Sequence, residues 1–234
     1  MPWTASGRPS GRRWRSAGPA AWAWPRSVEL AIGQLGNLAI RRFNRNMRIS
    51  AGEHRGRRLQ SPKGSRTRPT SDLLRQALFN VLGPRIQGAS VLDLFAGTGT
   101  VGLEALSRGA ATAAFVENDR RAVASLRANL ATLNLMARAR VLAGDAFSRL
   151  ARLEEAGERF DWIFLDPPYG ANDLAVRCIE ILAHGAVLRE NGALLVQAFH
   201  KTALPERVGT LRRTWRRRYG ESSLTLYVKE AECR

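Results

Sequence analysis

The chain has 234 residues, of which 44% are hydrophobic and 7% aromatic, and it carries a formal net charge of +17. This length and apolar content suffice for a buried core, so a wholly disordered chain is excluded. The two cysteines, Cys178 and Cys233, and three histidines without metal-ligand spacing argue against a disulfide scaffold and a zinc enzyme. No uncharged apolar run approaches the roughly 18 residues that a membrane helix requires.

The positive charge is concentrated toward the two ends of the chain. The net charge is +7 over residues 1–46, +6 over 47–84 and +5 over 207–234, but −1 over 85–206. Solubility alone does not require this asymmetry. A near-neutral centre with basic flanks indicates a core whose edges contact a polyanion, and nucleic acid is the favoured partner.

The first 84 residues divide into two stretches. Residues 1–46 combine Arg, Ser, Gly and Pro without periodicity and predict a disordered basic extension, although an over-long start before Met47 explains them more simply. From Met47 to Leu59 the residues alternate as in a strand or hairpin, and after a basic loop Thr70 or Ser71 can cap a helix over residues 72–82. We expect residues 47–84 to form a basic hairpin and helix that face the nucleic acid.

Residues 85–234 alternate between strand and helix patterns. Apolar strands are expected at residues 90–94, 112–117, 139–143, 162–165 and 193–199, with helices at 100–108, 119–133, 146–156 and 173–184 between them. This order is typical of a doubly wound, mostly parallel α/β sheet with helices on both faces. Two further strands, at 210–219 and 223–229, are joined at Gly220 into an antiparallel C-terminal hairpin, which makes seven strands.

A glycine-rich turn follows the first strand, in the sequence Asp93-Leu-Phe-Ala-Gly97-Thr-Gly99-Thr-Val-Gly102. Glycines let the backbone turn sharply and approach a ligand closely. The string matches G-x-G-x-x-G, and Glu117 ends the next strand. This pattern alone is also compatible with a dinucleotide.

Acidic residues decide between the cofactors. The carboxyl ends of parallel strands meet at one crevice, and a rim of carboxylates there repels a pyrophosphate but suits the sulfonium and ammonium groups of S-adenosylmethionine. Glu117 can accept hydrogen bonds from a ribose, and Asp145 from an adenine amino group. Each acid could instead cap the helix that follows it. The four acids that end or closely follow successive strands are Asp93, Glu117, Asp145 and Asp166.

The tetrapeptide Asp166-Pro-Pro-Tyr169 follows the fourth strand. Its two prolines stiffen the turn and remove two backbone donors, so the local set of polar groups is almost purely accepting. Such a set suits an exocyclic amino group, whose two N–H bonds it would accept while the nitrogen lone pair faces a methyl donor. Tyr169 offers a flat face for an extruded base. An Asp-Pro turn with a packing tyrosine is the alternative.

These motifs resemble those of S-adenosylmethionine-dependent amino-methyltransferases, and more closely the bacterial RsmD-type family, which methylates N2 of guanine 966 in 16S ribosomal RNA. The glycine string and Asp166–Tyr169 look like motifs I and IV. The RsmD-type resemblance spans about residues 47–230. It is carried by Met47-Arg-Ile-Ser-Ala-Gly-Glu-His-Arg-Gly-Arg, Arg68-Pro-Thr-Ser-Asp, Arg75-Gln-Ala-Leu-Phe-Asn, Gly102-Leu-Glu-Ala-Leu-Ser-Arg-Gly and Phe115-Val-Glu-Asn-Asp.

The resemblance implies a seven-stranded class I methyltransferase sheet, with its final strand antiparallel, and the small ribosomal subunit or a late precursor as substrate. In-line methyl transfer needs no metal, and we expect a cytoplasmic monomer. Gln197 stands where we expect a glutamate, and we assign it no role. Asp166, Pro167 and Tyr169 are the expected catalytic residues. The expected cofactor site comprises Asp93, Phe95, Gly97, Gly99, Glu117, Asp145 and Ala146.

The basic loop supplies the best candidates for phosphate contacts. They are Arg55, Arg57, Arg58, Lys63, Arg66 and Arg68, with a second set at Arg212, Arg213, Arg216, Arg217 and Arg218. Three other functions remain open. A DNA adenine methyltransferase would share motifs I and IV, a nicotinamide oxidoreductase would use the glycine string, and a non-catalytic RNA-binding protein would explain only the charge.

Overall fold

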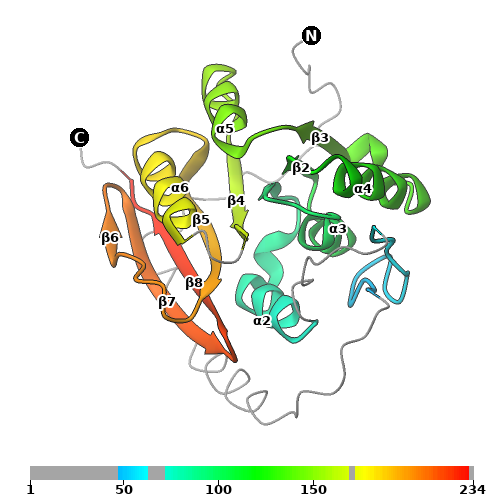
Figure 1. Ribbon diagram of the computed structural model, residues 1–234, viewed down its shortest axis with the longest axis horizontal. Coiled ribbons are helices and arrows are strands. Elements are labelled where there is room, and N and C mark those ends of the chain that lie inside the picture. Colours follow the sequence, from blue (N-terminus) through cyan, green and yellow to red (C-terminus); the bar gives the residue numbers. More distant parts are fainter. Residues whose placement is uncertain (1–46, 63–71, 169–171, 232–234) are drawn as a thin grey trace. The chain divides into compact units, whose positions relative to one another are not determined.

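Eight strands form a single sheet in the computed structural model, which describes residues 47–62, 72–168 and 172–231 (Figure 1). The strands are β1 (Ser90–Leu94), β2 (Thr112–Glu117), β3 (Ala139–Ala143), β4 (Phe160–Leu165), β5 (Leu188–Phe199), β6 (Arg207–Val208), β7 (Leu211–Tyr219) and β8 (Ser222–Lys229). Their order is β3-β2-β1-β4-β5-β8-β7-β6. Strands β1 to β5 pair in parallel, whereas β8, β7 and β6 join as antiparallel neighbours.

Helices connect the parallel strands, as the alternating sequence pattern predicts. The connecting helices are α3 (Thr100–Ser107), α4 (Arg120–Thr132), α5 (Ala146–Glu155) and α6 (Asn172–His184), with a short 3-10 turn η4 (Met136–Arg138) after α4. Helix α2 (Asp72–Leu82) and the 3-10 turn η3 (Gly83–Ile86) precede β1. The predicted helix bounds are confirmed to within one residue at each end. Within the described ranges, no helix is long and apolar enough to cross a membrane.

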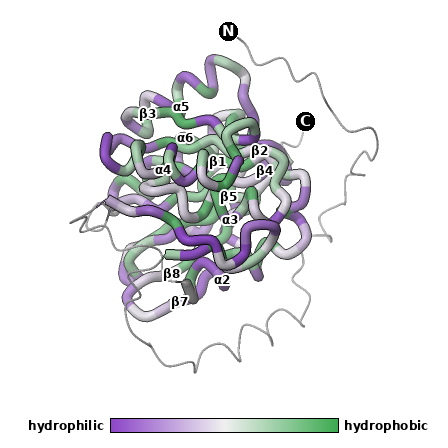
Figure 2. The backbone as a smooth tube through the Cα atoms, turned by 90° about the vertical axis from the view of Figure 1, so that its right-hand side faces the viewer, coloured by the Kyte–Doolittle hydropathy of each residue, from purple (hydrophilic) through white to green (hydrophobic). Residues whose placement is uncertain are grey.

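The two faces of the sheet are covered by different helices. Leu92 and Leu94 belong to an apolar cluster that also contains residues of α5 and α6. On the opposite face, the ring of Phe164 lies 6.1 Å from that of Phe79 in α2, and Phe115 packs under α3. Side chains of successive strand residues alternate between faces, so each strand contributes to both cores. Figure 2 shows hydrophobic residues along the central strands and hydrophilic residues toward the periphery. The doubly wound α/β prediction is confirmed.

The sheet departs from the sequence prediction at three places, the smallest of which is that β4 begins at Phe160 rather than at 162. The sheet has eight strands rather than seven, because residues 207 and 208 pair with Arg212 and Leu211 as β6. Two residues are too few to show an alternating pattern. Strand β5 begins at Leu188 rather than at 193, and its polar stretch contains Asn191 with a φ of 59°. The hairpin at Gly220, where φ is also 59°, is confirmed.

Residues 47–60, called the basic segment below, form a looser hairpin than the alternation predicts. A single antiparallel bridge joins Arg48 to Arg58, without regular strands. The turn includes Gly52, whose φ is 82° and at which an added Cβ would lie 1.9 Å from the Ser107 carbonyl oxygen. Glycine is therefore required where the basic segment meets the C-terminal end of α3.

Candidate active site

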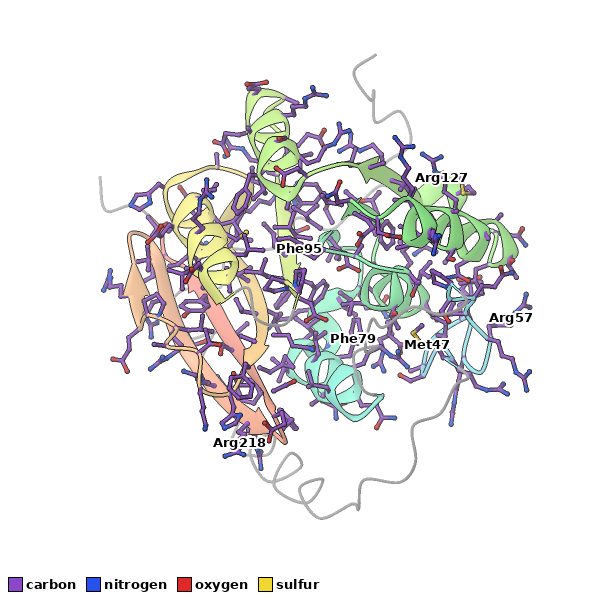
Figure 3. All side chains as sticks on the ribbon, in the orientation of Figure 1. Met47, Arg57, Phe79, Phe95, Arg127 and Arg218 are labelled. Carbon is purple, nitrogen blue, oxygen red and sulfur yellow. The ribbon has the colours of Figure 1, made fainter. Side chains whose placement is uncertain are left out.

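The glycine loop, residues 95–99, leaves β1 in a conformation that few side chains adopt. Phe95 has a φ of 68°, and Gly97 and Gly99 have φ values of 55° and 82°. A bulky residue in the left-handed region is strained, and such strain is concentrated at functional sites. A Cβ at Gly99 would lie 2.2 Å from Leu126, whereas one at Gly97 would meet no atom within 4 Å. The loop is therefore packed on one side and open at Gly97. Figure 3 shows Phe95 near the centre of the view.

Three amides of this loop donate hydrogen bonds within the protein. The Gly97 N–H donates to the Glu117 carboxylate at 2.6 Å, the Ala96 N–H to the Val116 carbonyl at 2.8 Å, and the Gly99 N–H to the Ala96 carbonyl at 2.8 Å. A dinucleotide site instead directs such amides at phosphate oxygens. The arrangement therefore favours a ligand that lacks phosphate.

Asp93 is buried where β1 approaches the glycine loop. Its side chain is 3% exposed and accepts a 2.8 Å hydrogen bond from the Gly102 N–H at the start of α3. The pKa of Asp93 is raised to about 7, chiefly by burial; the Gly102 hydrogen bond opposes this shift, and the charges of Asp166 and Glu117 add to it. The ends of β1, β2 and β4 thus bring three carboxyl groups into one electrostatic neighbourhood, which attracts a cation.

Glu117 and Asp145 end neighbouring strands but differ in what they contact. Glu117 is half-buried, and its second oxygen accepts the backbone N–H groups of Asn118 and Asp119 at 2.9 and 2.7 Å. Asp145 is exposed and caps α5 by accepting from the Ser148 N–H at 3.0 Å, which lowers the Asp145 pKa. Asp145 therefore acts as a helix cap in this structure, and the contact of Asp145 with adenine stays a prediction.

The Asp-Pro-Pro corner follows β4 directly. Asp166 is half-buried, Pro167 is buried and Pro168 is exposed. Neither proline carries an N–H group, so the backbone of Asp166–Pro168 has three carbonyl acceptors and only the Asp166 N–H as a donor. Tyr169 lies outside the described residues. Ala146, the remaining expected cofactor residue, is buried at the start of α5.

The predicted phosphate contacts fall into two groups. Arg55, Arg57 and Arg58 are exposed on the basic segment, and Arg57 donates to the Thr132 carbonyl at the end of α4 at 3.2 Å. Figure 3 shows Arg57 and Met47 beside α3 and α4. The other three predicted contacts, Lys63, Arg66 and Arg68, lie outside the described residues.

The second arginine set is largely engaged within the protein. Arg212 pairs with Glu230 at 2.5 Å, and Arg213 with Glu206 at 2.5 Å. Arg216 donates to two backbone carbonyls near the end of β5, at 2.9 Å each. These partners reduce the positive charge that β7 offers to a polyanion, so the basic segment is the better candidate surface.

Sequence reasoning missed a buried carboxylate, Glu104, that fastens the basic segment to α3. Glu104 is fully buried and accepts from the Ser50 N–H, the Ser50 hydroxyl and the Ala51 N–H at 2.7, 2.6 and 3.0 Å. Arg108 donates to it at 2.8 Å, and the buried Arg75 lies 3.6 Å away. These residues stand in the motifs that carry the family resemblance, so those motifs serve in part to dock the basic segment.

The sheet order, the glycine loop and the carboxylates at its rim define a class I methyltransferase. Within the described ranges, no cluster of three His, Cys, Asp or Glu side chains is arranged to hold a metal ion. Residues 47–228 match the model of a family described as conserved hypothetical protein 95. The chain belongs to this family, the RsmD-type methyltransferases that its motifs resemble.

Known proteins support this membership. Ribosomal RNA small subunit methyltransferase D of Escherichia coli K12 is 37% identical over 190 residues, covering 80% of this chain and 91% of that protein. The solved structure of yhhF from Escherichia coli has a TM-score of 0.71 at 37% identity and covers 80% of this chain and 99% of that one. A hypothetical protein of Thermus thermophilus has a TM-score of 0.66 at 38% identity, with 79% and 99% covered.

Proposed function

We propose that this protein transfers a methyl group from S-adenosylmethionine to the exocyclic N2 amino group of a guanine in 16S rRNA of the small ribosomal subunit. By family resemblance the target is guanine 966. The observation that carries the proposal is that Glu117 bonds to the glycine loop at Gly97, while the charges of Glu117 and Asp166 both act on buried Asp93. Acting on a ribosomal substrate, the protein would work in the cytoplasm.

The residues present fit this cofactor. Gly97 is open to a ligand, the amides of Ala96, Gly97 and Gly99 are bonded within the protein, and three carboxyl groups suit a cation that carries no phosphate. Asp93 and Glu117 would hold the methionine and ribose ends, and Asp145 with Ala146 would border the adenine. When bound, S-adenosylmethionine supplies an electrophilic methyl group, and its sulfur keeps the electron pair of the broken bond.

Asp166 and the Pro167 carbonyl would hold the guanine amino group. Accepting both amino hydrogens directs the nitrogen lone pair toward the methyl carbon, and Tyr169 would stack on the extruded base. After the new C–N bond forms, the amino nitrogen must lose one proton, and Asp166 is the carboxylate in place to receive it. Catalysis would then consist mainly of positioning and electrostatics.

The test is transfer of labelled methyl groups to small subunits that lack the modification, followed by mapping of the product nucleotide. We expect a single guanine labelled at N2. Label in duplex DNA adenine would instead support the DNA methyltransferase alternative. Absence of transfer with intact RNA binding would support the non-catalytic alternative.

Replacing Asp166 tests the catalytic role proposed for this residue. Asp166→Ala should lower the single-turnover rate by roughly 100- to 1000-fold, as for the loss of one preorganised polar contact. Glu190→Ala is a suitable control, because Glu190 is an exposed acid near the start of β5, at the opposite end of the parallel strands. A rate for Asp166→Ala that matches the control would contradict the assigned role.

A further inference from the structure

A buried amide on α4 connects two parts of the site that are far apart in sequence. Asn129 is 1% exposed and lies on the apolar stripe of α4 with Leu126 and Leu130. Its side-chain oxygen accepts the Gln60 N–H at 2.7 Å, and its nitrogen donates to the carbonyls of Gln60 and Thr98 at 3.1 and 3.2 Å. An asparagine amide has two N–H donors, so both are used.

One end of this connection is the basic segment. The two bonds to Gln60 hold both polar groups of its backbone, at the end of the segment that carries the exposed Arg57 and Arg58. The same segment is tied to the start of α3, because the Thr100 hydroxyl donates to the Met47 sulfur at 3.1 Å. Figure 3 shows Met47 between α3 and the remainder of the segment.

The other end is the glycine loop. Thr98 stands between Gly97, which is open to a ligand, and Gly99, which is packed against Leu126 of α4. Its carbonyl accepts from Asn129 at 3.2 Å. A shift of this carbonyl therefore changes the hydrogen bonding of the amide that holds Gln60, and a shift of Gln60 changes the support of the loop.

We propose that Asn129 is a positioning residue that couples cofactor binding at the glycine loop to RNA binding at the basic segment, so that each ligand strengthens the binding of the other. This inference rests on the proposed function. The first ligand orders one side of the shared amide, so the second ligand meets a site that has already lost part of its conformational freedom. Coupling of this kind is reciprocal.

A merely structural role predicts a different result. If Asn129 only stabilised the fold, its substitution would weaken cofactor and RNA binding independently, and their mutual enhancement would persist. The ratio of the cofactor dissociation constants without and with RNA separates the two cases. We call this ratio the coupling factor.

The experiment measures S-adenosylhomocysteine binding by calorimetry, with and without saturating small subunits that lack the modification. We expect a coupling factor of about fivefold or more for the wild type. In Asn129→Asp it should fall to nearly one, because a carboxylate cannot donate to the Thr98 and Gln60 carbonyls and repels both. The matched control is Asn134→Asp, the same change at an exposed residue after α4, which should keep the wild-type coupling factor.

A second variant tests the inference in case Asn129→Asp does not fold. Gln60→Pro removes the N–H that Asn129 accepts, at an exposed residue outside the core, and should also reduce the coupling factor. A wild-type coupling factor of one, or an unchanged factor in the folded variants, overturns the inference. Failure of the wild type to bind S-adenosylhomocysteine would instead overturn the proposed function.

Discussion

Asp93 and Glu104 are buried carboxylic acids in different surroundings. Asp93 lies on β1 and contacts α3 at Gly102, whereas Glu104 belongs to α3 itself. Glu104 lies among two arginines, two backbone amides and a hydroxyl, which together neutralise its charge. Asp93 accepts a backbone hydrogen bond from Gly102 and is influenced by two further acids, so burial and repulsion raise its pKa to about 7. A buried acid with cationic partners stabilises the fold, whereas a buried acid beside other acids favours the binding of a cation.

The largest expected effect is a loss of stability on substitution of Glu104. Glu104→Ala leaves Arg75 and Arg108 without their carboxylate, so the free energy of unfolding should fall by about 3–5 kcal/mol. Chemical denaturation measures this change. The control is Glu155→Ala, an exposed glutamate on α5, for which we expect a change within about 0.5 kcal/mol. Equal stability of the two variants would show that the ion cluster is not what docks the basic segment.

The raised pKa of Asp93 should make cofactor binding depend on pH. Asp93 has a raised pKa, so it holds a proton below about pH 7 in the cofactor-free protein, and only its ionised form attracts a cation. Binding of S-adenosylmethionine should therefore weaken by up to about tenfold per pH unit as the pH falls below 7. Asp93→Asn, which stays neutral, should bind more weakly at pH 8 and lose this slope in calorimetry. A slope that persists in the variant would assign it to another group.

The same pKa shift makes an opposite prediction for stability. The unfolded-state pKa of Asp93 is near 3.8 and the folded value is about 7, so the folded protein binds the extra proton between these values. The stabilisation from protonated Asp93 is complete below the unfolded pKa and is lost as the pH rises through 7. Relative to Asp93→Asn, the wild type should thus become less stable from pH 4 to pH 8. Denaturation curves of both proteins at the two pH values check this trend.

The smallest expected effect is the loss of RNA affinity on substitution of one arginine of the basic segment. Replacing one exposed phosphate-binding arginine, as in Arg58→Ala, should reduce RNA affinity severalfold and lower the slope of log affinity against log salt by about 1. Arg189→Ala is the control, because Arg189 is exposed but pairs with Asp161 at 2.7 Å beside the start of β4. Filter binding over a salt series measures both slopes. Identical slopes would remove Arg58 from the RNA-binding surface.

Much of the fold could be predicted because its signals are local. The helix over residues 72–82 follows from one apolar stripe, and the glycine string marks the end of β1 without reference to any distant residue. The acids at the strand ends could also be predicted, since parallel strands must place their carboxyl ends together. In the structure, Asp166 and Glu117 influence the pKa of Asp93, as expected for acids at neighbouring strand ends.

The parts that escaped prediction depend on distant partners. Glu104 and Asn129 stand inside helices, and their bonds to the basic segment span 53 to 54 residues for Glu104 and 69 residues for Asn129. The Thr98 carbonyl, the other partner of Asn129, lies 31 residues away. The one available signal was a polar residue in the apolar phase of a helix, at Asn129 between Leu126 and Leu130. For Asp145 the sequence allowed both a cap and an adenine contact, because an exposed aspartate before a helix also satisfies the Ser148 N–H.

Helix α3 has a further consequence, since all eight of its residues are buried. One side of it faces β1 and β2, and another is sealed by Ser50, Ala51 and Gly52. A fragment that started at β1 would expose this helix to water and invite aggregation. Any minimal version of the enzyme, and any insertion of it into a fusion protein, must therefore retain the chain from Met47 onward.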